Sequence, residues 1–121
     1  MNRLVILGRF EGMNEIVAAA KRHPGAYAKM KRENTLSVAL TASCQELPPI
    51  TNPVIIHFTY YEANKRRDPD NFAAGARKFI LDGLVEAKVI PKDGWGEIAG
   101  FTDEWHVDKD NPRVEVVIEE V

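Results

Sequence analysis

The chain lacks the features of a secreted, membrane-spanning or cysteine- and histidine-ligated metal protein. It has one cysteine, Cys44, which excludes an intrachain disulfide and is compatible with a reducing compartment. The longest early apolar run, residues 4–7, is far shorter than a signal-peptide core or the roughly 20 residues that span a bilayer. The histidines, at positions 23, 57 and 106, show no i, i+4 metal-ligand spacing. We therefore expect a cytoplasmic protein with no membrane partner.

The chain also has little net charge. Its 16 Lys and Arg residues against 18 Asp and Glu residues give a formal charge of −2, which offers no overall attraction to nucleic acid or to acidic membranes. The cations are nevertheless clustered, at positions 29–32 and 65–67, whereas the C-terminal third is rich in acids. This distribution predicts that one part of the surface is basic.

Length and composition are those of one ordinary globular domain covering residues 1–121. With 121 residues, 45% hydrophobic and 28% charged, the chain can bury one modest core. No internal repeat or low-complexity tract divides it. The disordered and fibrous classes are therefore excluded.

Hydrophobic periodicity predicts seven elements in the order β-α-α-β-α-β-β. Strands are expected near residues 3–8, 54–61, 97–107 and 113–120, and helices over 12–23, 26–43 and 71–87. The helix over 71–87 has apolar or small residues at i, i+4, i+7 and i+8. The turn sequence DKDNP suggests that the last two strands form a hairpin. The prediction is an α+β fold in which a small mixed β-sheet packs against helices.

The segment 65–72, KRRDPDNF, places three cations directly before two carboxylates. Pro69 biases Asp68 toward extended backbone, and residues i and i+2 of an extended segment project to the same side. Asp68 and Asp70 would then converge, with Cα atoms about 6 to 7 Å apart, and could hold Mg²⁺, which prefers oxygen ligands. Helix capping remains open as an alternative, because Asp70 and Asn71 are both good N-caps.

Two further features favour metal binding. Asp93, in the loop beyond the helix, offers another carboxylate, and the cations could bind phosphates beside the metal. Carboxylates for a metal and cations for a polyanion together suit phosphodiester hydrolysis. The expected DNA-binding residues are Lys65, Arg66, Arg67, Asn71, Lys29, Lys31 and Arg32. The last three could equally do no more than solvate a helix.

These residues resemble the RusA-like Holliday junction resolvases, endodeoxyribonucleases common in phages and prophages. The resemblance lies mainly in residues 65–98, which combine a basic segment, the D-x-D-N motif, a helix with a lysine-x-x-apolar-Asp-x-Leu pattern, and an aspartate beyond it. The sequence RVEVVIEE resembles the closing strand of the family, and Asn14 lies where members often have an asparagine. The resemblance covers about half the chain, residues 65–120.

The resemblance implies a homodimer that binds branched DNA and resolves four-way junctions by paired symmetric nicks, in recombination and repair. It implies Mg²⁺ as the cofactor, with Mn²⁺ as a substitute. By motif match, Asp68, Asp70 and Asp93 would be the catalytic, metal-binding carboxylates and Lys78 the catalytic lysine. Family members carry that lysine about one turn after the second aspartate, where this chain has Ala74. Lys78 lies about 12 Å along the helix axis from Asp70.

Two other functions remain open from the sequence. The displaced Lys78 leaves room for a non-catalytic protein that binds branched DNA on the same scaffold. The same carboxylates could also serve a small metal-dependent nucleotide phosphohydrolase, although a single nucleotide needs fewer cations than the chain supplies.

Four side chains outside the motif receive predictions of their own. By its strand position Trp105 is expected in the core, whereas Trp95, in a loop beside Asp93, is the better candidate for stacking on an unpaired base. His57 is expected to be a strand residue with a hydrogen-bond partner. Cys44 is expected to be a small core residue.

Overall fold

The computed structural model describes all 121 residues and contains four strands and three helices. In chain order these are β1 (Asn2–Leu7), α1 (Met13–Arg22), α2 (Pro24–Cys44), β2 (Val54–Glu62), α3 (Pro69–Glu86), β3 (Ile98–Val107) and β4 (Arg113–Glu120). The predicted α+β class and the order of elements are confirmed.

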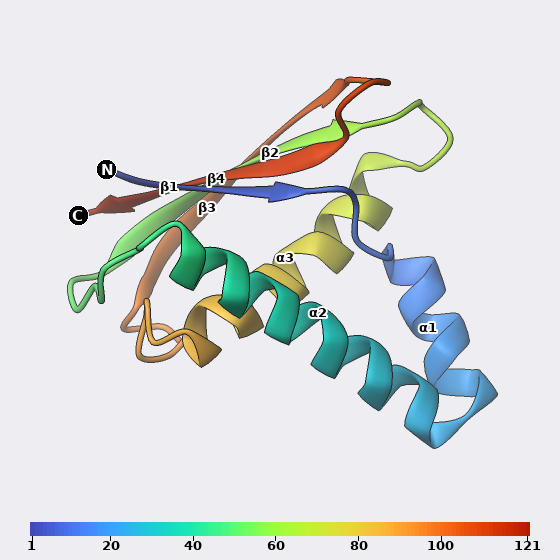
Figure 1. Cartoon of the computed structure of the whole chain (residues 1–121), viewed down its shortest axis with the longest axis horizontal. Helices are drawn as coiled ribbons and strands as arrows, with labels where there is room; N and C mark the ends of the chain where they lie inside the picture. Colours follow the sequence, from blue (N-terminus) through green and yellow to red (C-terminus); the bar gives the residue numbers. More distant parts are fainter.

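The four strands form one mixed sheet in the order β1-β4-β2-β3 (Figure 1). Strand β4 runs antiparallel to both of its neighbours, whereas β2 and β3 are parallel. The predicted hairpin between β3 and β4 is therefore wrong, because β2 lies between these strands. The segment β2-α3-β3 is a crossover unit, and a parallel pair needs such a connection. Residues 108–112 then only have to cross the width of β2, about 10 Å.

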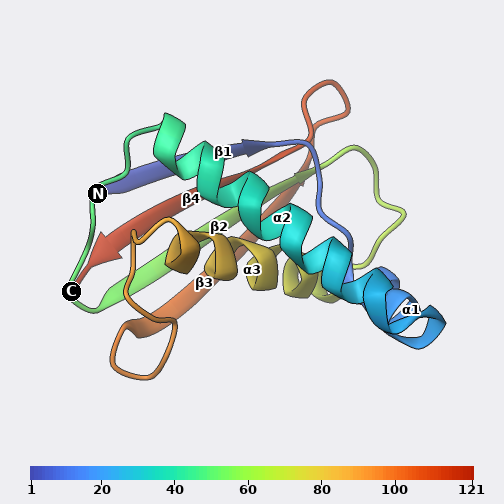
Figure 2. The same cartoon turned by 60° about the horizontal axis from the view of Figure 1, so that its bottom comes forward.

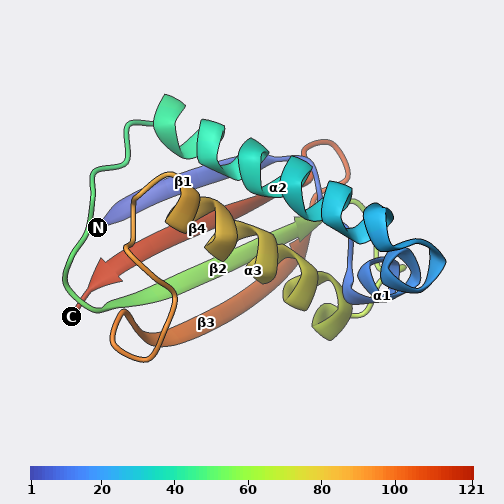
Figure 3. The same cartoon turned by 90° about the horizontal axis from the view of Figure 1, so that it is seen from below.

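All three helices lie on one side of the sheet. Figures 2 and 3 show α2 crossing the β1 and β4 side, and α3 crossing obliquely over β2, while the opposite face of the sheet has no helix over it. Strand β2 reflects this arrangement, because Val54, Ile56, Phe58 and Tyr60 are buried and the alternate residues are only partly buried. Its predicted two-faced pattern is confirmed.

The outer face of the sheet holds His57. One ring nitrogen lies 2.6 Å from the Thr102 hydroxyl and the other lies 2.8 Å from a Glu119 carboxylate oxygen. The prediction of a hydrogen-bonded strand residue is confirmed.

Helix α3 packs closely on its neighbours through two glycines. A Cβ atom at Gly75 would lie 2.1 Å from the backbone oxygen of Glu11, and one at Gly83 would lie 2.3 Å from the Val38 Cβ. These contacts bring α3 against the segment before α1 and against α2. The apolar stripe predicted for this helix is buried: Phe72, Ala76, Phe79, Ile80, Gly83 and Leu84.

The helices also decide two further points, the place of Cys44 and the question of a membrane span. Cys44, the last residue of α2, is exposed, so its predicted place in the core is wrong. None of the three helices combines the length and the apolar character that crossing a bilayer requires.

Candidate functional site

The candidate site lies where the loop after β2 leads into α3. This loop and the start of α3 lie at the same end of the molecule as α1 and the N-terminal half of α2 (Figures 1 and 3). The predicted cations of α2 therefore belong to the same end as the D-x-D-N motif.

Helix α3 begins at Pro69, two residues before the predicted start at 71. Proline suits the first helical position, because its fixed φ is helical and its missing N–H would have no partner there. Asp68 is the N-cap residue, with extended backbone (φ −73°, ψ 149°). Its backbone oxygen accepts the N–H groups of Asn71 and Phe72, at 3.0 and 3.2 Å.

The two motif carboxylates have no hydrogen-bond or ion-pair partner within the chain. The Asp68 side chain makes no capping hydrogen bond, and Asp70 lies in the first turn with no hydrogen bond or ion pair of its own. Neither Asp70 nor Asn71 is the cap, so that alternative is not supported. Because Asp70 is helical, the i, i+2 alternation of an extended segment does not apply to the pair. Both carboxylates are exposed and lie within the positive end of the helix dipole.

Asp93 lies at the other end of α3. This helix has 18 residues and is about 27 Å long, and Asp93 follows its C-terminus whereas Asp68 precedes its N-terminus. The three predicted carboxylates are therefore not brought together within one copy. The chain holds no group of three or more His, Cys, Asp or Glu side chains arranged to bind a metal.

A smaller magnesium site nevertheless fits the residues present. Mg²⁺ is often held by one or two carboxylates, with substrate phosphate oxygens and waters completing the octahedron. Asp68 and Asp70 are two unpaired carboxylates that lie two residues apart in one exposed turn. They could supply the protein's share of such a site, and Asp93 of the same copy could not.

Lys78 is placed apart from the motif carboxylates. It makes no hydrogen bond or ion pair, and it lines neither of the hollows that contain Asp68 and Asp70. At seven residues from Asn71 it shares that residue's face of α3. The Asn71 side chain accepts the backbone N–H of Asn14 at 2.8 Å, so this face points toward the start of α1.

Asn71 therefore already has a structural role. Its side chain is packed against Gly12, where an added Cβ would lie 2.6 Å from the Asn71 Nδ2 atom. The hydrogen bond to Asn14 fixes the beginning of α3 to the beginning of α1. Asn14, which the family resemblance singled out, thus meets the D-x-D-N motif in space.

The three cations before the motif differ in their surroundings. Arg67 forms two hydrogen bonds to Glu62, each 2.9 Å long, and donates to the Phe10 backbone oxygen at 2.7 Å. Lys65 and Arg66 are exposed, and their side chains form no ion pair. They are the cations of this segment that remain available to a phosphate.

The predicted cations of α2 are also exposed. Lys29, Lys31 and Arg32 project from the N-terminal half of this helix, and only Lys29 has an ion-pair partner, Glu33 at 3.8 Å. Such an exposed helical pair contributes little to stability. These cations therefore remain free to meet a polyanion.

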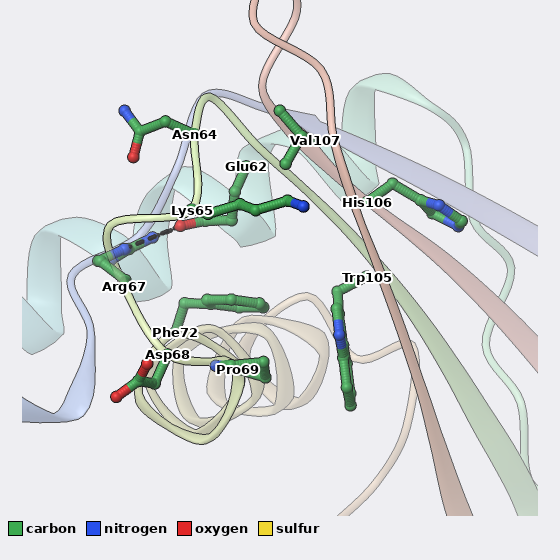
Figure 4. A pocket seen from close by; sticks show the side chains of 10 residues that line it. All are labelled: Glu62, Asn64, Lys65, Arg67, Asp68, Pro69, Phe72, Trp105, His106 and Val107. Carbon is green, nitrogen blue, oxygen red and sulfur yellow. Dashed lines mark hydrogen bonds and ion pairs between the residues drawn. The ribbon is translucent and has the colours of Figure 1, made fainter.

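A cavity of about 630 Å³ opens between this loop and the end of β3 (Figure 4). It is lined by Glu62, Asn64, Lys65, Arg67, Asp68, Pro69, Phe72, Trp105, His106 and Val107. Trp105 is 51% exposed, so its predicted place in the core is wrong. Its strand position does face the helices, but β3 is an edge strand that α3 does not cover. The sequence pattern alone could not reveal this edge.

A second hollow adjoins the first one and contains Asp70. There Arg77 of α3 is paired with Asp103 of β3, and the Tyr60 hydroxyl donates to the same carboxylate at 2.8 Å. Burial, and then Asp103, raise the pKa of Tyr60 well above its ordinary value. Burial, the largest influence, would lower the pKa of Arg77, but the hydrogen bonds and charges of Asp103 and Tyr60 together outweigh it, and the pKa is raised.

This group of three residues was not among the residues predicted from the sequence. One signal was present, because Arg77 follows Asp70 by seven residues and must share its helix face. The other signal required the parallel register, in which Asp103 lies beside Phe58 and Trp105 lies beside Tyr60. The predicted hairpin between the last two strands did not place Asp103 and Trp105 beside β2.

No protein-family model matches this chain, and no curated protein matches it in sequence.

Proposed function

We propose that this protein is a Mg²⁺-dependent endodeoxyribonuclease that acts on four-way DNA junctions as a homodimer. One observation carries the proposal: Asp68 and Asp70 are exposed carboxylates without hydrogen-bond or ion-pair partners, and they follow the unpaired cations Lys65 and Arg66 within a few residues of sequence. The resemblance of residues 65–98 to the RusA-like resolvases supports the same activity.

Each part of this site would have its own task. Lys65 and Arg66 would bind backbone phosphates and orient the strand, since phosphate contacts position DNA without reading its sequence. Asp68 and Asp70 would hold Mg²⁺, which when bound supplies Lewis-acid activation of water and offsets phosphate charge. The cations Lys29, Lys31 and Arg32 would extend the contact toward another arm of the junction.

The homodimer supplies a place for Asp93. Within one copy this residue lies a helix length away from Asp68, but a second copy could bring its own Asp93 to the site. A two-fold dimer also matches the symmetry of a junction that receives two symmetric nicks.

The test incubates a labelled four-way junction or linear duplex with the chain, with and without Mg²⁺. We expect Mg²⁺-dependent nicking of the junction that Asp70→Asn abolishes. Glu86→Gln, an exposed acid at the far end of the same helix, is the matched control and should nick normally. Mn²⁺ in place of Mg²⁺ should also support nicking. Equal cutting of the linear duplex would overturn the junction assignment.

A mixing experiment tests the contribution of Asp93 from the second copy. Asp70→Asn and Asp93→Asn should each be inactive alone, and mixing them should restore nicking because some dimers then hold one complete site. If Asp93→Asn alone nicks as well as the unmodified chain, Asp93 has no catalytic part.

The second candidate function is a non-catalytic protein that binds branched DNA. It is favoured by the distance of both Lys78 and Asp93 from Asp68 in one copy. Junction binding without nicking at any Mg²⁺ concentration would select this function.

A further inference from the structure

We propose that the cavity between the loop after β2 and the end of β3 binds one unpaired nucleobase. Trp105 would be the stacking surface, and Lys65 would hold the adjoining phosphate. This inference rests on the proposed nuclease function only for the source of the base, which would be a DNA strand at the junction. Base binding itself can be measured without any cleavage.

Trp105 lies where a base could stack on its ring. In the parallel pair of β2 and β3 it lies directly beside Tyr60, on the side of the sheet that carries the helices. Tyr60 is buried beneath α3, whereas Trp105 lies beyond the edge of that helix and keeps half of its surface exposed. The result is a large flat ring in a concave place, which suits base stacking of any sequence.

A fixed wall of side chains faces this ring. Figure 4 shows the indole of Trp105 standing across from Pro69, with the Phe72 ring beside them. Phe72 is buried and is held by an edge-to-face contact with Tyr60, at 5.5 Å between ring centroids. The Arg67 guanidinium lies 5.9 Å from the same ring centroid. A cavity of about 630 Å³ is within the range of small-ligand sites.

The charges around the cavity suit a phosphate. Lys65 extends over the cavity with its ammonium group reaching into it, whereas the carboxylate of Asp68 points outward (Figure 4). The charges of Arg67 and Glu62 offset each other in their ion pair. His106, also in the lining, lies 3.2 Å from Glu104. Lys65 is therefore the uncompensated cation of this cavity, and a phosphate next to a bound base would meet it.

The neighbouring hollow links the cavity to the D-x-D-N motif. Trp105 and Pro69 line both spaces, and the second space contains Asp70. A base held against Trp105 would therefore have its own backbone close to the motif carboxylates. This arrangement would let the protein recognise an unstacked nucleotide at the point where the strand is cut.

The test uses tryptophan fluorescence, since the chain has two tryptophans. Trp95→Phe leaves Trp105 as the reporter, and Trp105→Phe leaves the fully exposed Trp95 as the matched control. Each variant is titrated with three ligands: a ten-nucleotide thymidine strand, the same strand made abasic, and thymidine monophosphate. Divalent metal is left out so that no strand is cut. We expect the thymidine strand to quench Trp105 but not Trp95, and the abasic strand to quench neither.

Binding constants give the second readout. Trp105→Ala should weaken binding of the thymidine strand about 5- to 150-fold, the range measured for the loss of one stacked base. Trp95→Ala tests the stacking residue that the sequence favoured, and it should change binding less than twofold because Trp95 lies outside this cavity. Thermal melts would establish that both variants are folded. Lys65→Met should weaken binding of the thymidine and abasic strands alike.

Several outcomes would overturn the proposal. Equal quenching of both tryptophans, quenching by the abasic strand, or unchanged binding by Trp105→Ala would each exclude a stacked base. If thymidine monophosphate binds as tightly as the strand, the ligand of the cavity is a free nucleotide and not DNA. Junction nicking without quenching of Trp105 rejects the cavity alone, and quenching without nicking rejects the nuclease alone.

Discussion

The Arg67 guanidinium holds the Glu62 carboxylate through two parallel hydrogen bonds, from Nε to Oε1 and from Nη2 to Oε2, each 2.9 Å long. Both side chains are only 12% exposed. The same guanidinium donates to the Phe10 backbone oxygen at 2.7 Å. Arg67 thus joins the end of β2 to the segment before α1, and the loop that carries Lys65 and Arg66 is fixed at its base.

This relationship predicts that Arg67→Ala is destabilising. Removing the cation leaves the Glu62 carboxylate largely buried without a partner, and the free energy of unfolding should fall by about 3 kcal/mol. Urea denaturation would measure this loss. Arg66→Ala is the matched control and should stay within about 0.5 kcal/mol of the unmodified chain. Equal stability of the two variants would mean that the Arg67 pair contributes nothing.

Adjacent arginines with the same sequence pattern therefore have different roles. From the sequence alone, all three residues of the run KRR received the same prediction, which was DNA binding. The partner of Arg67 lies five residues earlier, at the end of a strand, and its third contact comes from a segment 57 residues away. Only the folded chain brings these groups together. Lys65 and Arg66 remain the predicted phosphate contacts.

Arg66→Ala should weaken junction binding and lower its salt dependence. A side chain that neutralises one phosphate contributes about 0.9 to the slope of log K against log salt concentration for duplex DNA. We expect the slope to fall by about that amount, measured by fluorescence anisotropy over a salt series without divalent metal. Arg3→Ala, an exposed arginine of β1 paired with Glu115, is the control. An unchanged slope would show that Arg66 does not face a phosphate.

Gly75→Ala should destabilise the chain although alanine is the better helix former. Alanine would gain about 1 kcal/mol in helix propensity, but its Cβ would lie 2.1 Å from the Glu11 backbone oxygen. Backbone cannot move aside as a side chain can, so we expect a net loss of about 1 to 2 kcal/mol in thermal or urea unfolding. Gly96→Ala, with no atom within 4 Å of the added Cβ, is the control. A more stable Gly75→Ala would contradict the close approach.

The parts of the fold that follow from local pattern were predictable, and those that depend on pairing were not. The apolar stripe of α3 and the alternation in β2 are visible in the sequence because each repeats with the period of its element. No periodic pattern in the sequence shows which strand pairs with β3. Because β3 pairs with β2 and not with β4, Trp105 is exposed and Asp103 lies beside Arg77. The surroundings of the candidate site were thus decided by topology.

The group of Tyr60, Asp103 and Arg77 predicts a specific dependence of stability on pH. The Tyr60 hydroxyl donates to Asp103 at 2.8 Å, and burial followed by this carboxylate raises its pKa above the ordinary value of 10.0. In the unfolded chain Tyr60 loses its proton near pH 10, whereas in the folded protein it keeps it. The stabilising contribution is therefore complete below pH 10 and is lost as the pH rises above it.

Tyr60→Phe should reveal this contribution. At pH 7 the variant loses the hydroxyl hydrogen bond and should be less stable by about 1 kcal/mol. Above pH 10 its stability should fall less steeply than that of the unmodified chain, because it has no phenol to titrate at this position. The two curves should therefore approach each other in melting temperatures measured from pH 8 to 11.5. Tyr27→Phe, which removes a hydroxyl without a hydrogen-bond partner, is the control and should follow the unmodified chain. Parallel curves for Tyr60→Phe and the unmodified chain above pH 10 would show that Tyr60 does not keep its proton in the fold.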